Sequence, residues 1–202
     1  MTAQRPERRS QAERRTETIA RLVEATIESI LEVGYHRTSL GEVCARSGVS
    51  KGGLFRHFDS RLDLVVAAAR TVADRHLAAF DAVRAAGGVQ GIEEMLLFTR
   101  TRARDQSNAV WFELLVAART DADLRELLAP VADSLYAAIE SRALESSFGS
   151  GQPEELVRLV TTSVLHLFDG EAIIRHTYPR PDLEEARLDA LGQLVNAVVG
   201  RP

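Results

Sequence analysis

The feature that most constrains this fold is a close succession of helix-start signals between residues 39 and 60. Residues 39–42 read SLGE and fit a capping box, in which a serine oxygen and a glutamate carboxylate each satisfy a free backbone N–H. Ser50 can cap a second helix and Ser60 a third. The first two helices must therefore be short, and Gly48 lies where a tight turn is needed between them. This pattern predicts a helix-turn-helix, with helices at 39–46 and 50–58.

The rest of the chain also predicts helices. Only 13 Gly and 6 Pro interrupt its 202 residues, and no segment shows the alternation of a strand. Ser107 and Asp121 are candidate caps of two later helices. We expect an all-α fold of about nine helices, an N-terminal three-helix domain followed by a C-terminal helical domain. The expected ranges are 16–33, 39–46, 50–58, 60–86, 90–105, 107–119, 121–147, 152–177 and 181–200.

Cysteine content and charge suggest where the protein acts. The single cysteine, Cys44, excludes an intramolecular disulfide and favours a reducing compartment. Neither an export signal nor a membrane-spanning apolar run is visible, so we expect a cytoplasmic protein without membrane contact. Residues 1–70 carry 12 Lys and Arg against 9 Asp and Glu, whereas the remainder carries 13 against 20. This asymmetry favours DNA contact by the N-terminal third, including a basic arm at 1–15.

The second helix of the motif carries the side chains that suit DNA recognition. In a helix-turn-helix this helix enters the major groove with its N-terminal residues facing base edges. Lys51 can donate to guanine or to phosphate, whereas Ser50 and His57 suit phosphate. Two poor helix formers, Gly52 and Gly53, suggest that the backbone comes close to some other group. The predicted DNA-binding residues here are Ser50, Lys51, Gly52, Gly53, Phe55, Arg56 and His57.

The segment 34–64, GYHRTSLGEVCARSGVSKGGLFRHFDSRLDL, resembles the DNA-binding signature of the TetR family. The resemblance covers about residues 12–75 and implies a helix-turn-helix domain at 16–60, a connecting helix at 61–86 and a ligand-binding and dimerisation domain at 87–202. It also implies that Thr38 and Ser39 cap the first helix of the motif near the DNA backbone and that Arg61 supplies a basic contact. Phe55 departs from the usual tyrosine of the family and lacks its hydroxyl.

The last two predicted helices have broad apolar faces. The resemblance implies that they pair with their copies in a homodimer, although the same faces could pack within one subunit. The predicted interface consists of Leu156, Leu159, Val160, Val164, Leu167, Phe168, Leu188, Leu191, Leu194, Val195 and Val198.

Aromatic residues and a methionine in the C-terminal part suit a pocket for an apolar ligand, and they equally suit an ordinary core. The candidate pocket residues are Met95, Phe98, Trp111, Phe112, Leu115, Tyr136 and His166. We expect no metal, because His166 and His176 are about 15 Å apart along one helix and Asp169 with His166 supplies only two ligands.

The sequence favours a non-enzymatic regulator. It contains no zinc-protease, P-loop, nucleophile-elbow or dinucleotide motif, and we expect no cofactor. The hypothesis is a repressor that binds a palindromic operator in double-stranded DNA as a dimer and is released by a small apolar effector, with activation as a variant outcome. The alternative is a helical scaffold or interaction protein without sequence-specific DNA binding.

Overall fold

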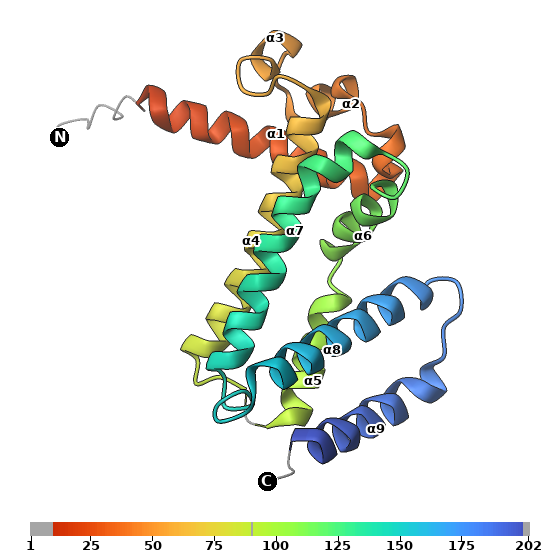
Figure 1. The fold of residues 1–202 in the computed structure, drawn as a ribbon. Coiled ribbons are helices and arrows are strands. Elements are labelled where there is room, and N and C mark those ends of the chain that lie inside the picture. The colour runs from red at the N-terminus through yellow and green to blue at the C-terminus, as the bar shows by residue number, and fades with distance from the viewer. Residues whose placement is uncertain (1–9, 90, 200–202) are drawn as a thin grey trace, which may run out of the picture.

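The computed structural model describes residues 10–89 and 91–199 of the chain. These residues form nine α-helices and one short 3-10 helix, with no strand among them, which confirms the all-α prediction. The helices, drawn in Figure 1, are α1 (Gln11–Val33), η1 (Tyr35–Arg37), α2 (Leu40–Ser47), α3 (Lys51–Leu54), α4 (Arg61–Ala85), α5 (Ile92–Ala103), α6 (Asn108–Ala117), α7 (Ala122–Glu145), α8 (Glu154–Ile174) and α9 (Pro181–Val199).

The first helix begins earlier than predicted. Ser10 and Glu13 form a reciprocal capping box, with Glu13 N donating to Ser10 Oγ at 3.2 Å and Ser10 N donating to Glu13 Oε2 at 2.7 Å. Residues 11–15 are therefore helical, and the prediction that the whole of 1–15 is an arm is wrong. Residues 1–9 of that arm lie outside the described part of the chain.

Serine and aspartate caps fix four of the later helix starts. Ser39, Ser50 and Ser60 each accept a hydrogen bond from the backbone N–H three residues ahead, and Asp121 does the same for α7. The prediction for Ser107 is wrong, because its side chain accepts no capping bond. Asp105 Oδ1 instead accepts from the Ser107 backbone N–H at 2.9 Å.

Two apolar clusters hold the helices together. The first joins α1–α3 to α4, α6 and α7, and its fully buried members include Leu22, Leu54 and Val65. The second joins α5, α8 and α9 around Leu96 and Phe168. Burial of such side chains supplies the main stabilisation of a helical fold.

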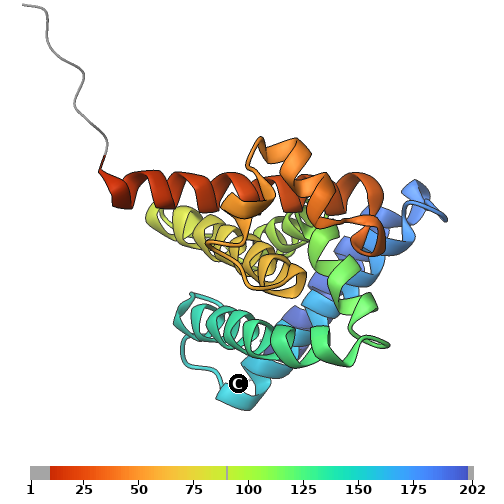
Figure 2. The ribbon, with the colours of Figure 1, turned by 90° about the horizontal axis from the view of Figure 1, so that it is seen from above.

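The long helices α4 and α7 pack side by side and run in the same direction (Figures 1 and 2). Their N-terminal ends lie beside the helix-turn-helix, and their C-terminal ends lie at the far end of the molecule, close to α5 and α8. This pair therefore spans the distance between the predicted DNA-binding residues and the C-terminal helices.

Candidate DNA-binding surface and ligand cavity

The turn of the helix-turn-helix is fixed by backbone conformation and by α1. Gly48 ends α2 with φ of 67° and ψ of 16°, a left-handed conformation that side-chain-bearing residues adopt at a cost. The guanidinium of Arg21 donates to the carbonyl oxygen of Ser47, which ties this turn to the first helix. Val49 packs against the first apolar cluster. These contacts hold α3 in a fixed position.

The recognition helix is shorter than predicted and strongly exposed. It covers Lys51–Leu54 rather than 50–58, and a turn follows it. Ser50 Oγ accepts from Gly53 N at 3.1 Å, so the helix start is capped. Lys51, Phe55 and Arg56 are exposed, and Phe55 shows 47% of its surface to solvent. An exposed aromatic between two cations with no ion pair to the described residues suits a polyanionic partner.

The two glycines of α3 differ in what surrounds them. A Cβ on Gly53 would lie 3.0 Å from Cγ1 of Val49, so the close approach predicted there is to the protein's own turn. A Cβ on Gly52 would meet no atom within 4 Å, and Gly52 is exposed. Internal packing therefore explains Gly53 and leaves the surface at Gly52 open to a partner.

Thr38 does not have the expected role. Its side chain is 2% exposed, donates from Oγ1 to Gly34 O at 3.0 Å and lies 3.1 Å from Ser29 Oγ. Ser39 alone caps α2, accepting from Glu42 N at 3.2 Å. The predicted capping role of Thr38 is therefore wrong, and its side chain is not available to DNA.

Arg61 is held by the protein and is not a free cation. Its Nε donates to Thr38 O at 2.6 Å, its Nη2 donates to Tyr35 O, and its guanidinium lies 4.3 Å from the centroid of the Tyr35 ring. The expected basic contact is engaged in joining the start of α4 to η1. His57 is half-buried, and its Nδ1 has no hydrogen-bond partner among the described residues.

A cavity of about 310 Å³ lies between α4, α5, α7 and α8. Two of the predicted pocket residues, Met95 and Phe98, line it, together with Phe80, Phe148 and Leu165. Its size is at the lower end of the range for small-molecule sites, and most of its wall is apolar.

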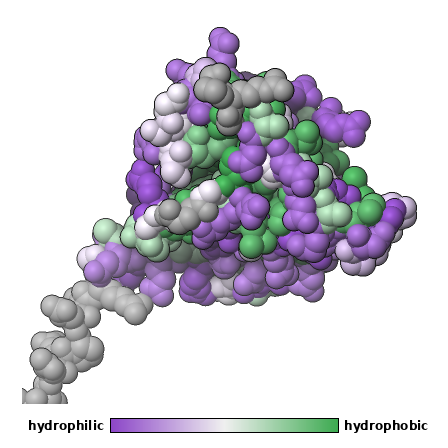
Figure 3. Space-filling model, turned by 90° about the horizontal axis from the view of Figure 1, so that it is seen from below, coloured by the Kyte–Doolittle hydropathy of each residue, from purple (hydrophilic) through white to green (hydrophobic). Residues whose placement is uncertain are grey.

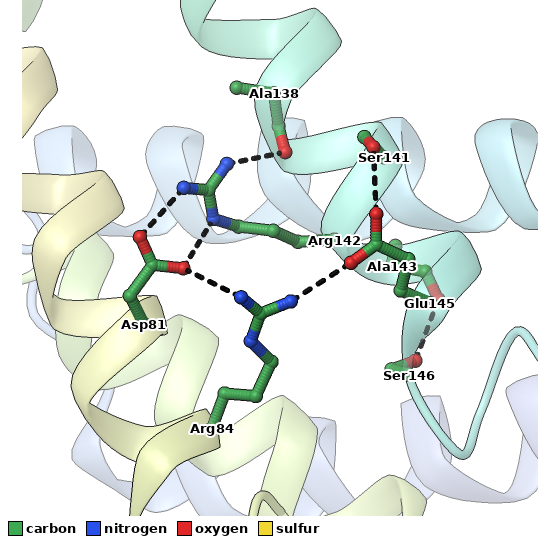
Figure 4. Close-up of polar contacts among 8 residues, drawn as sticks. All are labelled: Asp81, Arg84, Ala138, Ser141, Arg142, Ala143, Glu145 and Ser146. Carbon is green, nitrogen blue, oxygen red and sulfur yellow. Dashed lines mark hydrogen bonds and ion pairs between the residues drawn. The ribbon is translucent and has the colours of Figure 1, made fainter.

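Ion pairs at this cavity join the C-terminal ends of α4 and α7 (Figure 4). Arg142 donates from Nε to Asp81 Oδ1 at 2.9 Å and from Nη2 to Asp81 Oδ2 at 2.8 Å, while Arg84 Nη1 donates to Glu145 Oε2 at 2.9 Å. The bond from Arg142 holds the pKa of Asp81 below its usual value. Because these charges are paired with one another, the wall presents little net charge to a ligand.

A second cavity of about 40 Å³ adjoins the first and shares Phe80, Thr99, Ile139 and Leu165 with it. Its other lining residues are His76, Arg102, Ala103, Asn108, Trp111, Leu135, Tyr136 and Asp169, two of which, Trp111 and Tyr136, were predicted as pocket residues. Burial lowers the pKa of His76 and raises the pKa of Asp169 to about 6. This smaller cavity is the polar end of the site.

The other predicted pocket residues do not line these two cavities. Phe112 lines a separate surface groove beside α6, and Leu115 packs against the first apolar cluster. His166 is exposed and touches Tyr136 only edge-on, with ring centroids 6.4 Å apart. Sequence reasoning missed His76, although a lone histidine within the apolar α4 was a visible signal.

The apolar residues predicted at the dimer interface divide into three sets by burial. Four of them are buried within the subunit in the second cluster, so the prediction that they face a second copy is wrong: Val160, Val164, Phe168 and Val195. Leu156, Leu188 and Leu191 are half-buried against that cluster. The exposed members are Leu159, Leu167, Leu194 and Val198, and Ile173, Ile174 and Leu183 add to them. Figure 3, which views the end of the molecule opposite to α3, shows apolar surface among hydrophilic residues.

Within residues 10–89 and 91–199, no three side chains among His, Cys, Asp and Glu are grouped as metal ligands. No helix in the same ranges has the length and apolarity needed to cross a bilayer.

Similarity to known proteins covers both the motif and nearly the whole chain. A family model described as bacterial regulatory proteins of the tetR family matches residues 22–68. An uncharacterized HTH-type transcriptional regulator of Mycobacterium tuberculosis is 38% identical over 191 residues, covering 94% of this chain and 98% of that protein.

Two solved structures share the fold. The multidrug binding protein EbrR, complexed with imidazole, has a TM-score of 0.66 at 20% identity over 91% of this chain and 96% of its own. The transcriptional regulator FadR from Bacillus subtilis, in complex with stearoyl-CoA, has a TM-score of 0.61 at 16% identity over 86% of this chain and 97% of its own.

Proposed function

This chain belongs to the TetR family of bacterial regulatory proteins, and from that premise we propose that it is a repressor. It binds a palindromic operator as a homodimer in the cytoplasm and leaves the DNA when a small apolar effector binds. Membership of a family of helix-turn-helix transcriptional regulators agrees with the prediction that it is not an enzyme, and disfavours the helical scaffold.

The observation that carries the proposal is the exposed α3. Lys51 lies at the capped start of this helix, Phe55 and Arg56 follow its last residue, and all three are exposed. The proposed contacts are Ser39, Ser50, Lys51, Gly52, Phe55 and Arg56, which all lie on the surface. A helix N-terminus with added cations favours phosphate, and Lys51 can reach a base edge.

The exposed apolar residues of α8 and α9 support the dimer. Leu159 is 63% exposed and Leu194 is 64% exposed, and burial against a second copy removes such side chains from water. These helices lie away from α3 (Figure 1), so pairing through them leaves both recognition helices uncovered. The two recognition helices would then read half-sites about one DNA turn, roughly 34 Å, apart.

The helix pair α4 and α7 supports the link between effector and DNA. Asp81 and Arg142 join the two helices at the cavity, and Arg61 and Asp121 join their other ends to Tyr35 of η1. An effector that fits the cavity best when α4 and α7 are displaced shifts the population toward that arrangement. The same displacement moves the helix-turn-helix and lowers the affinity for the operator.

A gel-shift titration with DNA from upstream of the gene tests this proposal. We expect the purified protein to shift a fragment that contains an inverted repeat and to leave a scrambled repeat unbound at the same salt concentration. In vitro transcription from that fragment should fall when the protein is added. Failure to shift any upstream fragment at low salt would refute DNA binding, and increased transcription would refute repression.

A further inference from the structure

The 40 Å³ cavity forms the inner end of the site and holds polar groups that lack hydrogen-bond partners in the described part of the fold. His76 is 7% exposed, lines the 40 Å³ cavity, and its Nε2 is buried with no hydrogen-bond partner among the described residues. An unsatisfied buried nitrogen costs free energy, so a ligand that supplies its partner gains affinity. Asp169 lines the same cavity from α8.

The size of the inner cavity limits what can enter it. A cavity needs a volume of about 10–15 Å³ to hold one water molecule, so a cavity of 40 Å³ holds an end group of only a few non-hydrogen atoms. The adjoining 310 Å³ cavity is mainly apolar and takes a hydrocarbon body. A bulky end group such as a phosphate or a sugar does not fit the inner end.

The charges of the inner end select the kind of group. Arg102 Nη1 already lies 3.3 Å from Asp105 Oδ2, so its charge is matched within the protein, and only its buried Nε lacks a hydrogen-bond partner among the described residues. Burial lowers the pKa of His76 and therefore favours its neutral form, and the local Asp169 carboxylate repels an anion. A hydrogen-bond donor on the ligand satisfies Asp169, whereas a carboxylate does not.

We propose that the effector is an apolar compound with one small hydrogen-bond donor at its end, a hydroxyl or an amine, which bonds to Asp169 and to Nε2 of His76. The hydrocarbon body lies against Met95, Phe98 and Phe148 in the larger cavity. This inference rests on the proposed effector-binding function and specifies the chemistry of its ligand.

Calorimetric titration of the full-length protein with three probes of equal chain length tests the proposal. At about pH 7.5, where carboxylic acids are ionised and alkylamines are protonated, we expect octan-1-ol and octylamine to bind at least about tenfold more tightly than octanoate. Octanoate binding as tightly as the other two would overturn the proposal and would indicate that Arg102 reads an acidic end group. Binding of none of the three would also overturn it.

Two variants locate the bound end group and body. Asp169→Asn keeps the shape of the side chain, and we expect it to weaken octylamine binding about tenfold and to strengthen octanoate binding, because the charge that repels an anion is lost. Asp133→Asn on the exposed face of α7 is the matched control and should change nothing. Phe98→Trp narrows the larger cavity and should weaken octan-1-ol and octylamine together. Unchanged octylamine binding by Asp169→Asn would refute the proposal that the donor group of the effector bonds to Asp169.

Operator binding separates this inference from the proposed function. The gel shift of the ligand-free protein does not depend on the end group of the effector. A protein that shifts its operator but ignores all three probes remains a regulator with a different ligand class. A protein that binds the probes as expected but shifts no DNA contradicts the proposed function and leaves the ligand chemistry intact.

Discussion

The hydroxyl of Tyr35 donates a hydrogen bond of 2.8 Å to Oδ2 of Asp121, which joins the helix-turn-helix to the start of α7. Asp121 Oδ1 also accepts from Leu124 N at 3.0 Å and so caps the same helix. The backbone N–H of Leu124 and the Tyr35 hydroxyl together lower the pKa of Asp121. One carboxylate therefore starts α7 and ties it to the DNA-binding end.

Tyr35→Phe should weaken this connection without opening a cavity. Because Tyr35 is 2% exposed, loss of its hydroxyl leaves Asp121 short of a partner, and we expect the free energy of unfolding to fall by about 1 kcal/mol. Urea denaturation measures the change. Tyr178→Phe is the control, because Tyr178 is 62% exposed and its hydroxyl only accepts a bond from Arg180. Equal stability of the two variants would contradict a role for the Tyr35–Asp121 bond.

Lys51→Ala should lower operator affinity. If Lys51 contacts a base edge, the loss is about 1–3 kcal/mol and base preference relaxes at one position of each half-site. If it contacts phosphate, affinity falls equally for all sequences and the salt dependence becomes less steep. Competition gel shifts at two salt concentrations distinguish the two results. Arg158→Ala, on α8 and away from α3, should leave operator binding unchanged, and an unaffected Lys51→Ala protein would exclude α3 from the interface.

Leu194→Glu should convert a dimer into monomers, because it places a charge within the apolar face of α9. Light scattering after size-exclusion chromatography measures the mass in solution. Leu97→Glu changes a leucine of α5 that is 47% exposed and serves as the control, which should remain dimeric. A monomeric wild-type protein, or dimers of the Leu194→Glu variant, would place the partner surface elsewhere.

Local signals made the helix-turn-helix predictable, whereas long-range contacts limited the rest. Ser39, Ser50 and Ser60 act within three residues of themselves, so their capping could be read directly from the chain. Arg61 instead donates hydrogen bonds to backbone groups more than twenty residues away, so no local sequence pattern could predict that its guanidinium is bound by the protein.

Helical spacing alone also could not separate the core from the surface of α8. Val164 and Leu167 belong to the same apolar pattern, yet the packing of α5 and α9 buries the first and leaves the second exposed. The polar end of the cavity could not be predicted from the sequence for the same reason. His76 and Asp169 are far apart in the sequence and meet only because α4 and α8 line one cavity.

Glu171→Gln should destabilise the C-terminal helices at neutral pH. Glu171 is 9% exposed and accepts hydrogen bonds from Arg104 and Arg187, which join α8 to the end of α5 and to α9. Burial alone raises the pKa of Glu171, but the bonds from the two arginines outweigh it and hold the pKa below its usual value. Removal of one partner from such a buried cluster costs about 3 kcal/mol.

The pH dependence follows from the sign of that shift. A depressed pKa contributes stability above the unfolded-state value of 4.5, and this stability is lost as the pH falls through the lower folded-state pKa. The difference between wild type and Glu171→Gln should therefore shrink below about pH 4. Thermal unfolding at several pH values measures it. Glu155→Gln, at an exposed position of the same helix, should follow the wild type throughout, and a difference that persists in acid would contradict an ionic role.

Asp169→Asn should have the opposite pH dependence. Burial raises the pKa of Asp169 from 3.8 to about 6, against the opposing charge of His166, so the folded protein binds this proton more tightly than the unfolded chain does. Its stability contribution is complete below the unfolded value and is lost as the pH rises through about 6. Asparagine has no ionisable carboxyl group, so the ligand-free variant should gain stability relative to wild type as the pH rises from about 4 to about 6, and the gain should reach about 3 kcal/mol above that range. Urea denaturation across this range, with Asp133→Asn as the control, measures the gain. Parallel stability curves for wild type and Asp169→Asn would mean that the Asp169 carboxylate is as well solvated in the folded protein as in the unfolded chain. A hydrogen-bond donor of a ligand would then gain little by binding to it.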